Sequence, residues 1–269
     1  MESISMKIMS GGEQTAAVSH SSGDGQSIVY AAEYREGDRV AISVSTPGLY
    51  AIRLDEALPE AVVYIGGGNL IFPIPCGDER LCYSPKAFAG SCHLLWVRPA
   101  TALECAQRRN LAFNPYDRHL AKGFFPHATA NVETRNEAVF AARNALDGIF
   151  ENGSHGVYPY SSWGINRDPA AELRLDFGRP VRIDSLRLTL RADFPHDNWW
   201  KNATVRFSDD SSVVCSLSKT HLPQPIEIEP RVVEWLTLGQ LIQSDEPSPF
   251  PALTQLEVFG VEAGGIGSK

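Results

Sequence analysis

Alternation of apolar and polar residues with period two dominates the first hundred positions of the chain. In the run from 39 to 45, Val40, Ile42 and Val44 alternate with small or polar residues. This pattern is typical of an antiparallel strand with one buried face. On the same grounds we predict strands at 27–34, 39–45, 48–54, 60–66, 69–75 and 92–98. An all-β N-terminal domain is therefore expected over residues 1–98, with Gly66-Gly67-Gly68 as a hairpin turn.

The pattern breaks after residue 98, where proline, glycine and paired charges mark a connection over 99–125. Alternation resumes at 171–178, where the apolar side chains face one way and the charged ones face the other. Between 181 and 192 the apolar positions change from odd to even, which predicts a β-bulge near Asp184 and Ser185. Residues 202–218 show two strand patterns around an Asp- and Ser-rich turn, which predicts a hairpin.

One segment, 136–148, has a helical pattern. Val139, Ala142 and Leu146 recur at helical spacing, and Gly148 follows as a stop signal. A single short helix cannot supply the crossovers that a parallel sheet needs. The predicted fold class is therefore all-β, with two tandem antiparallel β-sandwiches of jelly-roll type, one at 1–98 and one at 126–263.

Composition narrows the class of protein. The 269 residues carry 24 Lys plus Arg against 32 Asp plus Glu, a net charge of −8, and 43% are hydrophobic. This balance excludes disorder as the main state, and without a Lys/Arg stripe nucleic acid is not an expected partner. No window reaches the roughly 18 to 20 uncharged apolar residues of a membrane span, and the first residues lack a signal-peptide pattern. We expect a soluble, cytoplasmic protein, with export left open if a leader has been removed; nothing in the chain indicates an oligomeric state.

Cysteine usage agrees with a reducing compartment. The chain has five cysteines, an odd number that cannot close a complete disulfide framework.

Several pieces of the second half occur in the order found in one known family. They are HATANVE at 127–133, the A-x-N-A-L-D-G turn at 142–148, Ser162-Trp163, AELRLDFGRPVRIDSLRL at 171–188, RFSDDSS at 206–212 and LTQLEVFG at 253–260. In this order they resemble the discoidin or coagulation-factor C-type domain, a galactose-binding-like jelly roll used by many carbohydrate-binding modules. The resemblance covers about half of the chain, and it implies a sugar or glycan as the partner of the C-terminal sandwich.

The same resemblance implies a structural calcium ion between the D-G turn and the last strand. Asp147 and Glu257 match the family's acidic residues, and the implied metal set is Asn144, Asp147, Asn152, Ser154 and Glu257. These side chains carry the hard oxygen donors that calcium prefers. Ile149 stands where the family has Asp or Asn, and the following loop is longer, so the metal site is where this chain departs from the family. The alternative is that Asp147 caps a turn while Glu257 lies on a solvated face.

Two loops carry the residues that suit sugar binding, which needs an aromatic plate beside polar donors and acceptors. The first loop contributes Arg191, Asp193, His196, Asn198, Trp199 and Trp200. The second contributes His155, Tyr158, Tyr160, Trp163, Asn166 and Arg167. By the resemblance, both loops lie at the same end of the sandwich. The alternative for Trp163, and for one of Trp199 and Trp200, is a place in the core.

Catalytic templates such as H-E-x-x-H, G-x-S-x-G and the Walker loop are absent from the sequence. Asp193, His196 and Asp197 are the best acid/base cluster. The sequence therefore favours a non-catalytic carbohydrate-binding protein over an enzyme. Two alternatives stay open: a small saccharide-active hydrolase or lyase with its site near the domain seam, and a protein-interaction scaffold.

Overall fold

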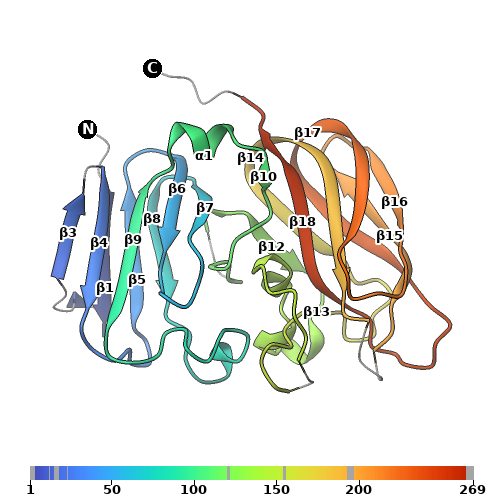
Figure 1. Ribbon diagram of the computed structural model, residues 1–269, viewed down its shortest axis with the longest axis horizontal. Helices are drawn as coiled ribbons and strands as arrows, with labels where there is room; N and C mark the ends of the chain where they lie inside the picture. Colours follow the sequence, from blue (N-terminus) through green and yellow to red (C-terminus); the bar gives the residue numbers. More distant parts are fainter. Residues whose placement is uncertain are drawn as a thin grey trace.

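Two antiparallel β-sandwiches lie side by side in the computed structural model, and the chain segment between them contributes to both (Figure 1). The structure describes residues 4–11, 13–14, 18–22, 24–119, 122–153, 156–192 and 197–264. The prediction of an all-β fold with antiparallel sandwiches is confirmed.

The N-terminal sandwich consists of two sheets. One has the order β2-β1-β5-β8, formed by Glu13–Gln14, Ile4–Ser10, Arg39–Val44 and Gly68–Pro73. The other has the order β11-β7-β6-β9-β4-β3, formed by Phe124–Phe125, Ala61–Ile65, Gly48–Arg53, His93–Pro99, Gly25–Tyr30 and Val18–Ser22. Val40, Ile42 and Val44 are at most 2% exposed, as their alternation predicts. All six strands predicted in this half are present, although β1, β2 and β3 were not predicted.

The glycines at 66–68 do not form a hairpin turn. β7 pairs with β6 and β11, whereas β8 pairs with β5 in the other sheet. The prediction was wrong because the glycines carry the chain across from one sheet to the other, and Gly67 and Gly68 have φ of +91° and +81°.

The C-terminal sandwich is built around three long strands, β14 (Leu173–Leu190), β17 (Gln224–Gln243) and β18 (Ala252–Glu262). Its main strand order is β10-β18-β14-β17-β15-β16, with β12 paired to β14 and β13 paired to β18. The shorter strands are β10 (Arg109–Asn110), β12 (His127–Ala130), β13 (Trp163–Gly164), β15 (Trp200–Phe207) and β16 (Ser212–Ser216). The predicted bulge is confirmed, because the register of β14 shifts between Ile183 and Ser185 against both neighbours. The predicted hairpin is β15 with β16.

The predicted helix at 136–148 is instead a series of short 3₁₀ turns: η2 (Thr134–Asn136), η3 (Ala138–Phe140) and η4 (Ala142–Leu146). Ala141 has extended backbone angles, φ −72° and ψ 151°, which separates η3 from η4. Val139, Ala142 and Leu146 are nonetheless buried. The apolar spacing was therefore a correct guide to burial and a wrong guide to helix type.

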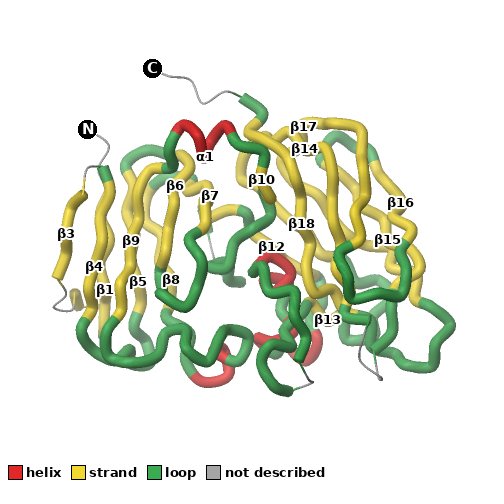
Figure 2. The backbone as a smooth tube through the Cα atoms, viewed as in Figure 1, coloured by secondary structure: helices red, strands yellow, loops and turns green. Residues whose placement is uncertain are grey.

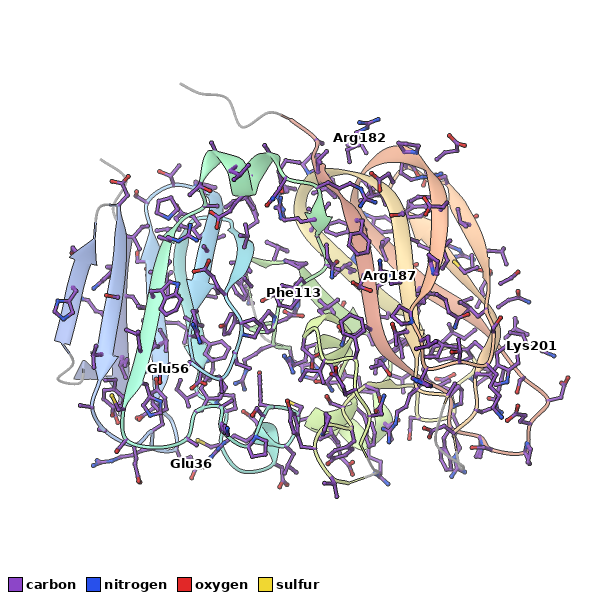
Figure 3. The ribbon with its side chains drawn as sticks, viewed as in Figure 1. Glu36, Glu56, Phe113, Arg182, Arg187 and Lys201 are labelled. Atoms are coloured by element: carbon purple, nitrogen blue, oxygen red, sulfur yellow. The ribbon has the colours of Figure 1, made fainter. Side chains whose placement is uncertain are left out.

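The predicted connection at 99–125 begins with the short helix α1 (Ala102–Ala106) and is paired into both halves. Its strand β10 pairs with β18 of the C-terminal sheet, and β11, at its end, pairs with β7 of the N-terminal sheet. Phe113, labelled in Figure 3, lies between the two sandwiches. The boundaries at 98 and 126 stay predictions. Within the described ranges, no helix is both long and apolar enough to cross a membrane.

Candidate functional site

Two of the tryptophans predicted to bind ligand lie in the core of the C-terminal sandwich. Trp163 is 0% exposed and Trp200 is 1% exposed, and their ring centroids are 6.3 Å apart. The Trp163 indole donates a hydrogen bond to the carbonyl of Val132 at 3.1 Å. In this structure the two rings pack beneath the loops and offer no surface to a ligand.

The predicted polar residues Arg191 and Asn198 are buried as well, and they hold the loops together. Arg191 is 2% exposed, its Nη1 donates to the carbonyl of Tyr160 at 2.8 Å, and its Nε lies 3.4 Å from Asp197 Oδ2. Asn198 donates to the carbonyls of Glu246 and Ser248 at 3.0 and 2.6 Å. Both side chains therefore fix main-chain segments at the end of the sandwich.

A smaller set stays accessible at that end. Arg167 is exposed and lies over the ring of Phe250, 4.6 Å from its centroid. Asn166 is exposed, whereas Trp199 is half-buried with its indole 3.2 Å from Glu246 Oε1. Tyr158 is half-buried and is not part of this set, because its hydroxyl faces Ser84 of the N-terminal half. His155, Asp193 and His196 lie outside the described residues.

A cavity of about 920 Å³ lies elsewhere, at the seam between the sandwiches. Its walls come from β8, from the chain around η1 (Gly77–Arg80), from the connection at 116–119 and 124, and from the 3₁₀ turns at 136–143. Figure 2 shows the short helical segments at the lower edge of the molecule, between the two sets of strands. Tyr160 completes the lining, and it is the predicted ligand residue that the structure brings to this cavity.

Aromatic rings form the inner wall of the seam cavity. The ring of Phe72, on β8, lies edge-on to that of Tyr116, with ring centroids 6.2 Å apart. Phe72 and Tyr83 both pack against Phe88 behind the wall, with ring centroids 5.9 and 5.4 Å from it. Burial raises the pKa of Tyr83 to about 12, so its hydroxyl stays protonated at neutral pH. Phe72, Tyr83 and Tyr116 are at most 4% exposed, so half-buried Tyr160 is the most accessible of the aromatic rings that line the cavity.

Paired charges form the rim. Arg118 lies 2.6 Å from Glu79, donates to the carbonyl of Pro73 at 2.6 Å, and sits 5.6 Å from the Phe72 ring centroid. His119 contacts Glu133 at 2.6 Å. Glu137 pairs with Arg135 at 2.7 Å. Each of these acidic side chains thus has a basic neighbour.

A buried arginine supports the cavity from behind. Arg143 donates from Nε to the carbonyl of Asp117 at 3.0 Å and from Nη2 to that of Pro115 at 2.8 Å, and it lies over the Tyr83 ring at 4.6 Å. Its Nη1 is 3.6 Å from the Cys82 sulfur, and burial raises the pKa of that thiol. These bonds hold the connection against η4 and so fix the shape of the cavity.

Residues predicted to hold calcium surround the D-G turn, but they are not all brought together. Asn144 is fully buried and donates to the carbonyls of Ala138 and Ser162. Burial raises the pKa of Asp147 to about 6, although neighbouring Arg143 opposes the shift. Asn152 donates to Thr254 Oγ1 at 3.3 Å.

The other two residues predicted to hold calcium are Glu257, on β18, and Ser154. Glu257 contacts Arg187, labelled in Figure 3, at 3.3 Å. Ser154 lies outside the described residues. In the described part of the chain, no group of three or more His, Cys, Asp or Glu side chains is arranged to hold a metal ion.

No protein-family model and no curated protein matches the chain. Similar solved structures include the family 32 carbohydrate-binding module of C. perfringens NanJ in complex with galactose, with 16% identity, a TM-score of 0.37 and coverage of 49% of this chain and 91% of that one. A Streptococcus pneumoniae fucose binding module has 16% identity, a TM-score of 0.41 and coverage of 57% and 99%. Chitosan-binding module 1 from a Paenibacillus chitosanase/glucanase has 18% identity, a TM-score of 0.38 and coverage of 56% and 99%. Because the identities lie below 20% and the TM-scores below 0.5, we take no ligand or activity from these likenesses.

Proposed function

We propose that this chain is a carbohydrate-binding protein whose ligand lies in the seam cavity between the two sandwiches. The observation that carries the proposal is the combination of an accessible aromatic ring, Tyr160, with charged side chains such as Arg118 and Glu79 around one cavity of about 920 Å³. That volume is within the range of small-molecule sites, roughly 300–1,000 Å³.

The balance of charge favours a neutral sugar over an anionic or cationic ligand. Of the three acidic side chains that line the cavity, Glu79 is paired with Arg118 and Glu137 with Arg135; the third is Asp78. A rim of this kind offers donors and acceptors together, and sugar hydroxyls act as both. The C–H face of the sugar would lie against ring faces such as Tyr160, which is half-buried and therefore reachable.

The same pairing favours binding over hydrolysis. General acid catalysis of glycoside cleavage needs a protonated carboxyl facing the scissile bond. Glu79 and Glu137 at the rim are instead each engaged by an arginine. An assay for new reducing ends, run with each bound oligosaccharide, tests this point, and turnover would identify the protein as an enzyme.

A glycan array followed by calorimetry on the best ligand tests the site. Truncating a central arginine or aromatic anchor costs about 2 kcal/mol of binding free energy, roughly 30-fold in affinity. We expect that loss in Arg118→Ala and Tyr160→Ala, and a smaller loss in Tyr83→Phe, which removes only a hydroxyl. Asp209→Ala, in the distant β15–β16 turn, should bind like wild type.

A second pair of variants tests the end of the C-terminal sandwich. Arg167→Ala and Phe250→Ala remove the accessible cation–π pair found there. If these two variants lose the ligand while Arg118→Ala and Tyr160→Ala keep it, the seam cavity is not the site.

A further inference from the structure

Gln255 occupies a central position between the last strand and the D-G turn. It lies on β18 opposite Thr189 of β14, it is 2% exposed, and its side chain reaches residues more than a hundred positions earlier. The D-G turn here means residues 144–149.

The amide nitrogen of Gln255 is surrounded by four oxygen atoms. Nε2 lies 2.8 Å from the carbonyl of Asn144, 2.8 Å from Asp147 Oδ1, 3.2 Å from the carbonyl of Ile149 and 2.6 Å from the carbonyl of Thr254. The two amide protons are shared among these acceptors. A shell of carbonyl and carboxylate oxygens is what a calcium ion would otherwise gather.

A further hydrogen bond fixes the direction of the amide. The backbone N–H of Gly148 donates to Gln255 Oε1 at 2.9 Å. Turning the amide over would set Nε2 against that N–H and Oε1 against four acceptors. The network therefore determines which end of the amide faces the turn.

One carboxylate lies at the turn, with an arginine near it. Asp147 is 3.9 Å from Arg143 Nη1 and both side chains are buried, but Asp147 Oδ2 has no hydrogen-bond partner among the described residues. The second acidic residue, Glu257, is two positions along β18 from Gln255, roughly 7 Å away at the usual rise of a strand, and it is paired with Arg187. The Gln255 amide nitrogen already occupies the centre of the oxygen shell, so the residues present leave no room for a calcium ion at that point.

We propose that the Gln255 amide takes the place of the cation and ties the D-G turn to the last strand, so that this sandwich is stable without metal. A calcium ion would hold oxygen atoms of the D-G turn and of the last strand at one point. Here the two N–H groups of the Gln255 side chain hold them.

Thermal unfolding in excess chelator and in millimolar calcium tests the proposal. The wild-type protein should have the same Tm in both. Gln255→Glu replaces the donor with a carboxylate among four oxygens, so its Tm in chelator should fall by about 5 °C or more, and calcium should restore it. Gln240→Glu, at an exposed position of β17, is the matched control and should show neither effect.

A wild-type Tm that falls in chelator and rises with calcium would overturn the proposal and make Gln255 a metal ligand. A Gln255→Glu variant with wild-type Tm in chelator would also overturn it, because the amide donors would then contribute nothing. If Gln255→Glu does not fold, the wild-type comparison decides alone.

Discussion

At the scale of single residues, the two core tryptophans differ in one hydrogen bond. The Trp163 indole N–H is bonded to the Val132 carbonyl, whereas the buried Trp200 indole N–H has no hydrogen-bond acceptor among the described residues. A buried donor without an acceptor costs about 1–3 kcal/mol. Trp200 is therefore held by packing alone.

Because of this difference, the same substitution should reduce stability by different amounts at the two positions. Trp163→Phe leaves the Val132 carbonyl without its donor, while Trp200→Phe removes an unsatisfied one. We expect Trp163→Phe to lower the free energy of unfolding by about 1–2 kcal/mol more than Trp200→Phe does. Chemical denaturation followed by far-UV circular dichroism measures both, and equal losses would contradict the prediction.

His127 and Asp117 form a buried pair whose contribution depends on pH. The atoms Nδ1 and Oδ1 are 2.6 Å apart, and Asp117 also accepts from the Ala128 N–H. Burial alone lowers the pKa of His127, but the Asp117 hydrogen bond and charge more than offset it, so the pKa is raised. A raised pKa means that protonated histidine stabilises the folded state, fully below its ordinary pKa near 6.5 and less as the pH rises through the folded pKa.

We therefore expect His127→Gln to cost about 2 kcal/mol at pH 6, the order of a hydrogen bond to a charged group, and less at pH 9. Urea unfolding of both proteins across this range gives the difference directly. A difference that grows toward high pH would show that the sign is wrong.

At the scale of elements, the bulge in β14 explains a glycine in β18. A Cβ atom at Gly260 would lie 2.1 Å from the carbonyl oxygen of Arg182, beside the register shift at Ile183. At Gly239 in β17 it would meet only the flexible side chain of Glu172, at 3.1 Å. The bulge thus brings two backbones together at Gly260, whereas at Gly239 only a side chain is near.

Alanine substitution at these two glycines should distinguish crowding by main-chain atoms, at Gly260, from contact with a flexible side chain, at Gly239. Gly260→Ala should destabilise by about 1–3 kcal/mol, since the crowding involves main-chain atoms that can move only together. Gly239→Ala should stay within about 1 kcal/mol of wild type. Urea midpoints provide the comparison, and similar midpoints would mean that β18 shifts freely at the bulge.

Most strands could be predicted from the sequence because their faces differ in polarity. The alternation at Val40, Ile42 and Val44, and the change of phase near Asp184, each correspond to an observed feature. The helix at 136–148 could not be predicted correctly, since the spacing of Val139, Ala142 and Leu146 reports which side chains are buried. Extended angles at Ala141 preserve that burial in 3₁₀ turns.

At the scale of the whole molecule, each sandwich has a core that includes side chains from outside its own predicted range. Val139 and Phe140 belong to the C-terminal half, yet they pack in the N-terminal core, as does Tyr116, which donates to the Pro59 carbonyl at 2.8 Å. Leu111 and Ala112, from the connection, pack in the C-terminal core. Cutting the chain into two fragments near the seam would therefore expose apolar side chains that are buried in the whole protein.

We expect the full chain to unfold in one calorimetric transition and a fragment of residues 126–264 to be less stable than one of 101–264. The longer fragment keeps β10 and the burial of Leu111, roughly 2–3 kcal/mol for that side chain alone. Two resolved transitions, or fragments of equal stability, would support independent sandwiches instead.

A site near the domain seam was predicted only for the hydrolase or lyase alternative. Most residues that line the cavity were not predicted, because its walls come from separate segments whose meeting depends on how the sandwiches pack. Tyr160 was predicted from the density of rings beside glycine and proline. Arg118 and Tyr116 lie in a segment interpreted as a connection, where the run PYDRH at 115–119 was the available signal. Trp163 and Trp200 were predicted as ligand-binding residues but are buried in the core. Residue type alone does not distinguish a tryptophan that binds a ligand from one that packs in the core.

The side chains that cross the seam also limit how the cavity can respond to a ligand. Opening the seam would pull Val139 and Phe140 out of the N-terminal core in which they are buried. The cavity is therefore shaped before a ligand arrives, and binding there should order few groups. Little conformational entropy is then lost on association, so even a sugar with few contacts can be retained, at the cost of tolerating few ligand shapes.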